Sequence, residues 1–578
     1  MPTLNWIGKE AVVKHHKDVP FRLLEPVIEF SCGDADSGNL LVQGDNLDAL
    51  KSLLPRYGGK VKCIYIDPPY NTGNESWIYN DNVNSPEIKK WLGDVVEKEG
   101  VTLDRHDRWL CMMYPRLLLL KQFLREDGLI FVSIDDNEQQ SLRWIMDEIF
   151  QSRNFVTQFV WNTEGHTDNQ FHIKVNHEYV VCYAKNVQAA TFGHVVDPNT
   201  REGSNLWAGF AENSITKNGP ANPPSEITLP IGFPVAVDCI GLPATDVPNG
   251  LIDAMLNEKL SSNPLKRRFG KVQFPVRFDE MVSANGALVK ECRVFSGWAN
   301  ARKLAAFIKN KCLPILDEDG SQIRFYLSES GVIYYRRERG DKARNILSVL
   351  RGFSTTEKMR SELERMGLHF KYPKPKELVQ YIIKVASEDG DLIMDSFAGS
   401  GTTGHAAMEL SRDGFPRNFI LIEMDKNTAS EVTSRRLKNV SQGYVSTDGV
   451  EVAGTDIGFQ FYRLSKEPLF CANGQIREDV SFSQLAEFVW FAETGIGFTG
   501  SPTTPLLGIH EGRAIYLLYN GILNDKALGG GNVLTGPVFD VLPQFKGPKV
   551  IYAAANRMGM RLTRENAIFK QTPYALEV

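Results

Sequence analysis

The sequence predicts an α/β fold in which one mostly parallel sheet is built from two separate stretches of the chain. Short apolar segments rich in β-branched residues, such as 61–66 and 128–135, alternate with segments whose apolar residues recur at helical spacing. This alternation is typical of β-α-β units, whose strands are parallel. It is lost after about residue 186 and returns near residue 375. We therefore expect an inserted domain of a different kind between the two stretches.

The chain has 578 residues, which is more than one hydrophobic core usually supports. The inserted stretch is rich in proline and glycine and interleaves basic with aromatic residues, which indicates an α+β domain. We predict five segments: an N-terminal arm (1–38), the first half of the sheet domain (39–186), the inserted domain (187–365), the second half of the sheet domain (366–445) and a small α/β C-terminal domain (446–578).

Composition excludes some classes of protein. The formal net charge of -5 does not indicate a general nucleic-acid binder, so any basic surface must be local. The eight cysteines are scattered without a CxxC pair, which is typical of reduced thiols in the cytoplasm and argues against a zinc site. The first residues lack the apolar region of a signal peptide, and no stretch is apolar for long enough to span a membrane. We expect a cytoplasmic protein without a bound metal.

The first half of the sheet domain begins with a β-α-β unit. A strand over 39–43 ends at Asp45, a helix covers 47–54, and the strand over 61–66 ends at Asp67. Because parallel strands end at the same edge of a sheet, we expect Asp45 and Asp67 to lie at one edge. The elements that follow are a long polar loop (71–102), a helix (109–123), a strand (128–135), a helix (142–150) and two strands (155–161 and 178–184).

The tetrapeptide Asp67-Pro68-Pro69-Tyr70 ends the buried strand over 61–66. Proline cannot donate to a sheet ladder, so the strand must stop there. An acid, two stiff residues and an aromatic ring are thus placed at the carboxyl edge of the sheet, where open α/β sheets bind ligands. The alternative is an ordinary turn that uses prolines to leave a strand.

In the second half, a helix over 375–387 precedes a strand over 391–395, a glycine-rich loop, a strand over 418–422 and a helix over 428–440. Gly399, Gly401 and Gly404 match the spacing of dinucleotide-binding loops, and Glu423 stands where an acid can bind ribose hydroxyls. An NAD enzyme would fit equally well, and a tight turn without a ligand is the other alternative. Phe397 and the hydroxyls of the loop favour a nucleoside that bears an amino acid. The C-terminal domain shows strand patterns at 514–519 and 549–553.

DPPY, together with DSFAGSGTT at 395–403, resembles the S-adenosylmethionine-dependent amino-methyltransferases of DNA. DPPY comes first here, as in the β class, which implies a Rossmann-like methyltransferase sheet in circularly permuted order. The segments IYIDPPYNTG, CMMYPRL, EDGLIFVSIDDNE, HEYVVCYAKN and YPKPKEL are similar to those of modification subunits of type III restriction systems. The resemblance covers about 40–186 and 366–440, and the inserted segment would be the target-recognition domain.

The resemblance implies a role for each residue at the sheet edge. Asp67 and the carbonyl of Pro68 would accept the two N–H bonds of the target amino group, and Tyr70 would stack on the base, with Pro69 between them. Glu423 would bind the ribose of the cofactor, and Asp45 its adenine or amino group. Asp395 would shape the turn or hold the cofactor amine. The methionine part would meet Phe397, Gly399, Gly401 and Thr402, and its carboxylate would lie near Lys374 and Pro375.

Contacts with DNA are expected from less specific features. Phe171, in the polar loop 162–177, could touch a base outside the helix, although a solvated loop is as good an explanation. Two basic clusters of the inserted segment could follow phosphates, with a solvated charged edge as the alternative. Their residues are Lys266, Arg267 and Arg268 in the first cluster and Tyr335, Arg336 and Arg337 in the second.

The function that the resemblance implies is site-specific methylation of N6 of a flipped adenine in double-stranded DNA, within a restriction-modification or phage-defence system. Asp as the first residue of DPPY fits adenine, because N4-cytosine enzymes usually carry Ser there. The implied partners are double-stranded DNA, a second copy of the chain and a restriction (helicase-nuclease) subunit. Two alternatives stay open: methylation of RNA or of a protein amide, and a DNA-recognition subunit that guides a nuclease with little turnover.

Overall fold

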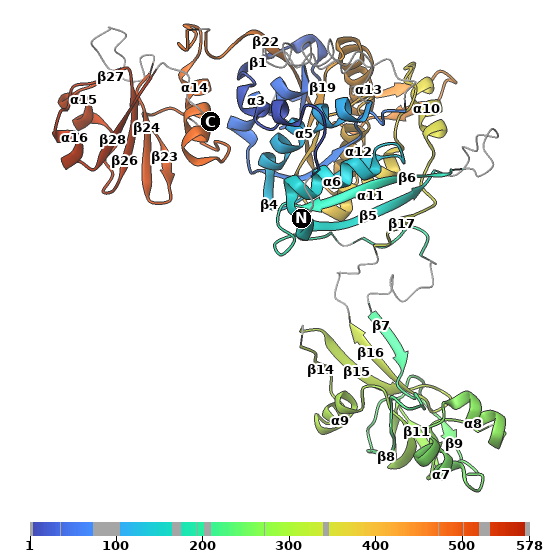
Figure 1. The fold of residues 1–578 in the computed structure, drawn as a ribbon. Helices are drawn as coiled ribbons and strands as arrows, with labels where there is room; N and C mark the ends of the chain where they lie inside the picture. The colour runs from blue at the N-terminus through green and yellow to red at the C-terminus, as the bar shows by residue number, and fades with distance from the viewer. Residues whose placement is uncertain are drawn as a thin grey trace. The chain divides into compact units, whose positions relative to one another are not determined.

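The computed structural model forms two compact units, residues 1–193 with 347–578, and residues 194–346 (Figure 1). We predicted an inserted domain over 187–365, and the second unit is shorter than that prediction. The difference arises because β17 (Val349–Leu350) pairs with β5 of the first unit. The structure describes residues 4–34, 36–72, 105–163, 175–193, 195–200, 210–270, 272–318, 320–338, 346–471, 473–500, 502–519 and 532–572.

Ten strands of the described residues form one sheet in the first unit, in the order β1-β22-β2-β19-β18-β3-β4-β6-β5-β17. The strands from β22 to β4 are parallel, whereas β6 is antiparallel to both β4 and β5. Ile393 of β18 lies opposite Cys63 of β3, so the two halves of the chain meet in mid-sheet as predicted. The bounds are β1 Arg22–Pro26, β2 Leu40–Gln43, β3 Val61–Ile66, β4 Leu124–Ile134, β5 Phe155–Asn162, β6 His177–Ala184, β18 Leu392–Asp395, β19 Asn418–Glu423 and β22 Gln460–Pro468.

Besides β17, two more strands of this sheet lie outside the segments in which we predicted it. β1 belongs to the predicted N-terminal arm, and β22 lies beyond residue 446, where we predicted a separate C-terminal domain. β22 pairs in parallel with β2 and antiparallel with β1. The sheet therefore continues to residue 468 before the C-terminal elements begin.

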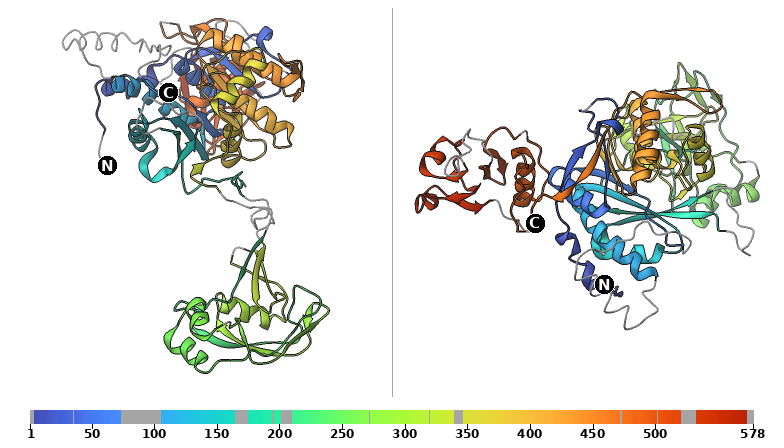
Figure 2. Two further views of the ribbon diagram at one scale, coloured as in Figure 1. Left: turned by 90° about the vertical axis from the view of Figure 1, so that its right-hand side faces the viewer. Right: turned by 90° about the horizontal axis from the view of Figure 1, so that it is seen from above.

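Helices cover both faces of the sheet, and they can be followed by colour in Figures 1 and 2. α3 (Asn46–Tyr57), α5 (Arg105–Phe123) and α6 (Gln139–Met146) share a core with Ile420 and Ile422 of β19. α12 (Thr402–Arg412) instead approaches Leu421 at its Gly404. Because successive side chains of a strand point to opposite faces, α12 lies on the other face. It contacts α11 (Lys376–Ala386) and α13 (Arg435–Gln442).

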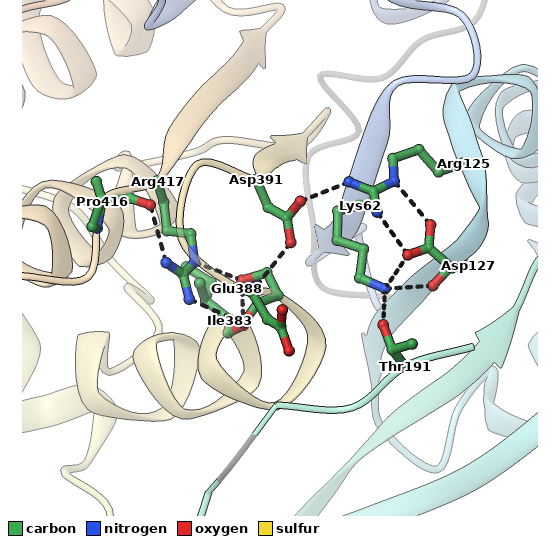
Figure 3. Close-up of polar contacts among 10 residues, drawn as sticks. Lys62, Arg125, Asp127, Thr191, Ile383, Glu388, Asp391, Pro416 and Arg417 are labelled. Atoms are coloured by element: carbon green, nitrogen blue, oxygen red, sulfur yellow. Dashed lines mark hydrogen bonds and ion pairs between the residues drawn. The ribbon is translucent and has the colours of Figure 1, made fainter. Parts of the chain in front are cut away.

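A polar network joins the amino ends of three central strands (Figure 3). Arg125 of β4 donates to Asp127 and to Asp391, which directly precedes β18. Lys62 of β3 is buried and donates to Asp127 and to Thr191. These bonds tie the first half of the sheet to the second at the end opposite the predicted ligand edge.

The other elements of the first unit are short, except in the C-terminal part. That part is a four-stranded sheet, β23-β24-β26-β28, in which β24, β26 and β28 are parallel, with α14 packed on α3. Before the C-terminal part, the remaining elements of the first unit are α1 Lys9–Val12, α2 His15–Asp18, α10 Thr356–Arg365, β20 Gly443–Val445 and β21 Glu451–Ala453. The bounds within the C-terminal part are α14 Phe482–Thr494, β23 Leu506–His510, β24 Arg513–Leu517, β25 Val533–Leu534, α15 Gly536–Val541, β26 Lys549–Ala553, β27 Ala555–Asn556, α16 Arg561–Arg564 and β28 Ala567–Gln571.

The second unit has its own hydrophobic cores and is built from small antiparallel sheets, β10-β13-β8, β12-β11-β9 and β14-β15-β16-β7. Its bounds are β7 Phe210–Ser214, β8 Pro224–Leu229, β9 Gly241–Leu242, α7 Leu251–Asp253, α8 Ser262–Phe269, β10 Val276–Arg277, β11 Met281–Ala284, β12 Ala287–Leu288, β13 Cys292–Gly297, α9 Ala301–Lys309, β14 Ile315–Leu316, β15 Gln322–Leu327 and β16 Ile333–Glu338. Across the described residues of both units, no helix has the length and apolarity that a membrane crossing needs.

Candidate active site

The carboxyl edge of the central sheet gathers most of the residues that the sequence singled out. Asp67 follows β3, Asp45 follows β2, and the glycine loop follows β18. Glu423 ends β19. β19, β18 and β3 are consecutive in the sheet, so a ligand at the glycine loop lies between Glu423 and Asp67.

Backbone geometry explains the glycines of the loop. Gly399 and Gly401 have φ of +49° and +82°, in the left-handed region that favours glycine, and Gly401 is the N-cap of α12. A Cβ atom on Gly401 would lie 2.8 Å from Cγ2 of Thr433. On Gly404 it would lie 2.8 Å from Leu421, so that glycine allows α12 to pack closely on the sheet.

Two buried carboxylates hold the loop. Asp395 accepts hydrogen bonds from the Phe397 backbone N–H (2.9 Å) and the Thr403 hydroxyl (2.5 Å). Glu423 accepts from the backbone N–H groups of Gly399 (2.8 Å) and Asp425 (2.9 Å). Burial raises the pKa of each carboxyl to about 7. Asp395 thus shapes the turn, which was one of its two expected roles.

Arg436 is a residue of the loop support that sequence reasoning missed. It lies on α13, is fully buried, and donates to the carbonyl and hydroxyl of Ser400 and to the hydroxyl of Thr402. A second nitrogen of the guanidinium, Nε, donates to Nδ1 of His405 at 3.2 Å. Since arginine forms several directed hydrogen bonds at once, Arg436 fixes the loop from behind.

The groups around the loop fit a nucleoside cofactor that carries an amino acid. The N-terminus of the eleven-residue α12 favours a negatively charged group. Asn46 donates to the carbonyl of Ser396, while Asn46 Oδ1 and Ser396 Oγ are buried without a partner among the described residues. Asp45 caps α3 through the N–H groups of Leu47 and Asp48, yet its side chain stays 43% exposed. These atoms can pair with the amino and hydroxyl groups of such a cofactor.

The DPPY segment is held by neighbours from distant parts of the chain. The Trp109 indole N–H donates to the Pro69 carbonyl at 2.7 Å, and the Tyr70 hydroxyl donates to Glu178 Oε2 at 3.0 Å. Within the described part of the chain, no group donates to the Pro68 carbonyl. Burial raises the pKa of Asp67, and the nearby Lys374 ammonium opposes that effect.

The Lys374 side chain contacts the DPPY segment, which the resemblance did not imply. Its Nζ is 3.1 Å from Asp67 Oδ1 and 3.2 Å from Glu178 Oε2, and its expected place near the carboxylate of the cofactor stays a prediction. Burial lowers the pKa of Lys374, but the two carboxylates outweigh it and raise the pKa above its ordinary value. Pro375 is the N-cap of α11. Glu178, which sequence reasoning had not assigned a role, is thus part of the site.

A buried acid supports the turn that follows Tyr70. Asn71 has a φ of +58° and donates to Glu138 Oε1, which also lies 2.7 Å from Nδ1 of His106. Asn71 and Glu138 are both fully buried. Asparagine tolerates the left-handed region better than most residues, so Asn71 lets the chain leave the sheet edge sharply.

The predicted DNA contacts have mixed outcomes. Phe171 lies outside the described residues. Lys266, Arg267 and Arg268 are exposed on α8, and Arg268 pairs with Glu258. The prediction for Tyr335 is wrong in its geometry, since the side chain is only 9% exposed and packs in the core of the second unit. The neighbours in the second cluster also have partners: Arg336 lies over the ring of Phe210 and Arg337 is 3.5 Å from Asp317.

Comparison with known proteins gives one family. The family model described as DNA methylase matches residues 61–434. A Mod subunit of the type III restriction-modification enzyme StyLTI from Salmonella typhimurium is 28% identical over 80% of this chain and 66% of its own length. The EcoP15I Mod subunit from Escherichia coli is 28% identical over 93% of this chain and 79% of its own length.

The solved structures that resemble the chain are more distant. The M1.HpyAVI-SAM complex is 13% identical, covers 69% of this chain and all of its own, and superposes with a TM-score of 0.28. Because this TM-score is low, the fold is assigned from the strand order and the motifs described above.

Proposed function

The chain belongs to the DNA methylase family, and from this membership we propose that it transfers the methyl group of S-adenosylmethionine to N6 of adenine at specific sites in DNA. One observation carries the proposal: β18, which bears the glycine loop, pairs in parallel with β3, which ends at Asp67. The carboxyl ends of two paired parallel strands lie side by side. A methyl donor at the loop therefore lies next to an acceptor at Asp67.

The DPPY segment suits an amino group as acceptor. The exocyclic nitrogen of adenine is a poor nucleophile, because its lone pair is delocalised into the ring. Asp67 accepts one N–H and the Pro68 carbonyl accepts the other, which favours a pyramidal nitrogen whose lone pair can attack. Tyr70 offers a ring face for the base, which must leave the duplex to reach the sheet edge.

The glycine loop and the ends of β2 and β19 hold the cofactor. S-adenosylmethionine, when bound, supplies an electrophilic methyl group on a sulfonium centre. Phe397, Gly399, Gly401 and Thr402 would surround its methionine part, and Glu423 would meet its ribose. Asp45 is exposed enough to accept from its amino groups. Together these contacts would orient the methyl group toward Asp67.

Family membership favours DNA over RNA or a protein amide as the substrate. An intact Asp67, Tyr70 and glycine loop favour turnover over a purely guiding role. Because the similar Mod proteins are subunits of type III restriction-modification enzymes, we place this chain in such a system. Its proposed partners are a restriction subunit and a second copy of the chain, in the cytoplasm where the DNA lies. The second unit is proposed to choose the target site.

Product analysis tests this function. The purified full chain is incubated with S-adenosylmethionine and with genomic DNA from a strain that lacks the gene, and the digested nucleosides are identified by mass spectrometry. We expect N6-methyladenine as the product. N4-methylcytosine, or the absence of any methylated nucleoside, would contradict the proposal.

A further inference from the structure

Lys374 joins three other side chains in one cluster at the end of β3. Its Nζ is 3.1 Å from Asp67 Oδ1 and 3.2 Å from Glu178 Oε2. It also lies over the Tyr70 ring, 4.7 Å from the centroid, and the Tyr70 hydroxyl donates to the same Glu178 oxygen. One ammonium thus bridges two carboxylates and covers one ring.

That ammonium occupies both positions that a target adenine needs. An amino group that donates to Asp67 has to come within about 3 Å of its carboxylate. A stacked base has to cover the face of the Tyr70 ring. Since Lys374 contacts the same carboxylate, through Oδ1, and lies over the same ring, its ammonium competes with a base for this space.

Glu178 gives the displaced cation a place to stay. The Lys374 side chain is only 10% exposed, and an unpaired charge in such surroundings is strongly unfavourable. An ammonium that leaves Asp67 but remains on Glu178 keeps a charged partner throughout. The same carboxylate holds the Tyr70 hydroxyl, so it also keeps the ring in position for stacking.

We infer that Lys374 is a placeholder for the amino group of the target base, and that Glu178 is a positioning residue that retains Lys374 and Tyr70 once the base has taken Asp67. The inference rests on the proposed function and deepens it, because it assigns two further residues to the target-base side of the site. It also removes Lys374 from the cofactor side.

The charge of Asp67 gives a readout that a purely structural role would not move. The titratable groups that act on Asp67 come from β3 and its loop, from β6, from β18 and from the segment before α11; they are Tyr65, Tyr70, Glu178, Asp395 and Lys374. Lys374 is the cation among them. Its removal raises the pKa of Asp67. The carboxylate that accepts the N–H of the target amino group therefore becomes protonated at a higher pH than in the wild type.

The first test compares Lys374→Met with Lys371→Met, the same change at an exposed lysine three residues earlier. Binding of S-adenosylmethionine is measured by calorimetry, and single-turnover transfer of its tritiated methyl group to unmethylated genomic DNA is followed from pH 5 to 9. For Lys374→Met we expect a dissociation constant within about twofold of the wild type and an acid limb shifted up by about 1 pH unit or more. Lys371→Met should match the wild type in both.

A Lys374→Met protein that binds the cofactor about tenfold more weakly, with an unshifted acid limb, would overturn the inference. It would return Lys374 to the cofactor carboxylate. A wild-type chain that transfers no methyl group would instead reject the proposed function, and the binding comparison would still decide the place of Lys374.

The second test concerns Glu178, and each variant is compared on the alkaline plateau above its own acid limb, measured in the same way. Glu178→Gln should slow single-turnover transfer by about tenfold, because the ammonium then stays on Asp67 and blocks the base. The double variant Glu178→Gln with Lys374→Met lacks the blocking cation and should be faster than Glu178→Gln alone. A double variant that is no faster would contradict the placeholder role.

Discussion

Asp67 is the residue on which the chemistry depends, so its replacement separates catalysis from cofactor binding. Asp67→Ala should abolish methyl transfer, because the target amino group loses its acceptor, while the dissociation constant of S-adenosylmethionine should stay within about twofold of the wild type. Calorimetry and a tritium-transfer assay measure the two quantities. A variant that also lost cofactor binding would show that the two roles are not separate.

Asp395 should make the stability of the sheet unit depend on pH. Burial raises its pKa from 3.8 to about 7, so the folded state binds the proton more tightly than the unfolded state. Its stabilising contribution is therefore complete below about pH 4 and is lost as the pH rises through 7.

Asp395→Asn removes this titration and can still accept from the Phe397 N–H. Thermal unfolding at pH 5 and at pH 8 gives the difference in unfolding free energy between the variant and the wild type. From pH 5 to pH 8 this difference should shift in favour of the variant by an amount on the order of 2 kcal/mol. Removing the Asp395 charge also makes the pKa of Glu423 less raised, because the two carboxylates repel, and this change acts in the same direction. An equal difference at both pH values would contradict the assignment.

Single residues were predictable where a local motif determined their position. Asp67, Tyr70 and the loop glycines lie directly after strands, so recognising each strand end placed them. Glu178 and Arg436 were missed because their partners, Tyr70 and Ser400, are far away in sequence. The position of Lys374 next to α11 was correct, but the direction of its long side chain depends on Asp67 and Glu178, which no local pattern reveals.

The glycine loop shows how one element depends on its neighbour. Gly401→Ala should weaken cofactor binding and lower the unfolding temperature, because alanine is strained at a φ of +82° and its Cβ would lie 2.8 Å from Thr433 Cγ2. Thr433→Ser removes that methyl group and keeps the hydroxyl that donates to the Gly399 carbonyl. Adding it to Gly401→Ala should restore part of the loss in calorimetric affinity; no recovery would show that backbone strain alone is responsible.

Strands composed of apolar residues were predictable from the sequence, whereas strands that mix apolar and charged residues were not. β3, β18 and β19 read as buried runs because helices cover both faces, and a charged or proline residue ends each. β22 has the sequence QFYRLSKEP, in which apolar and charged residues mix. It pairs with β1 near the margin of the sheet and is only partly buried, so it lacks the pattern of a central strand.

The division of the chain into two units predicts that cofactor binding and site choice can be separated. Replacing residues 196–345 with a flexible linker of about 20 residues should leave the dissociation constant of S-adenosylmethionine within about twofold, because the loop and its supports lie in the first unit. Methylation at a defined sequence should be lost. A variant that still methylates the wild-type sequence would show that the second unit does not choose it.

The central claim is that the edge formed by β18 and β3 methylates adenine in DNA. Single-molecule sequencing tests it most directly, on genomic DNA from a host that expresses either the full chain or its Asp67→Ala variant. We expect N6-methyladenine at one short sequence motif with the full chain and no such mark with the variant. No new mark in either DNA, or an unchanged mark in the DNA of the variant, would contradict the account.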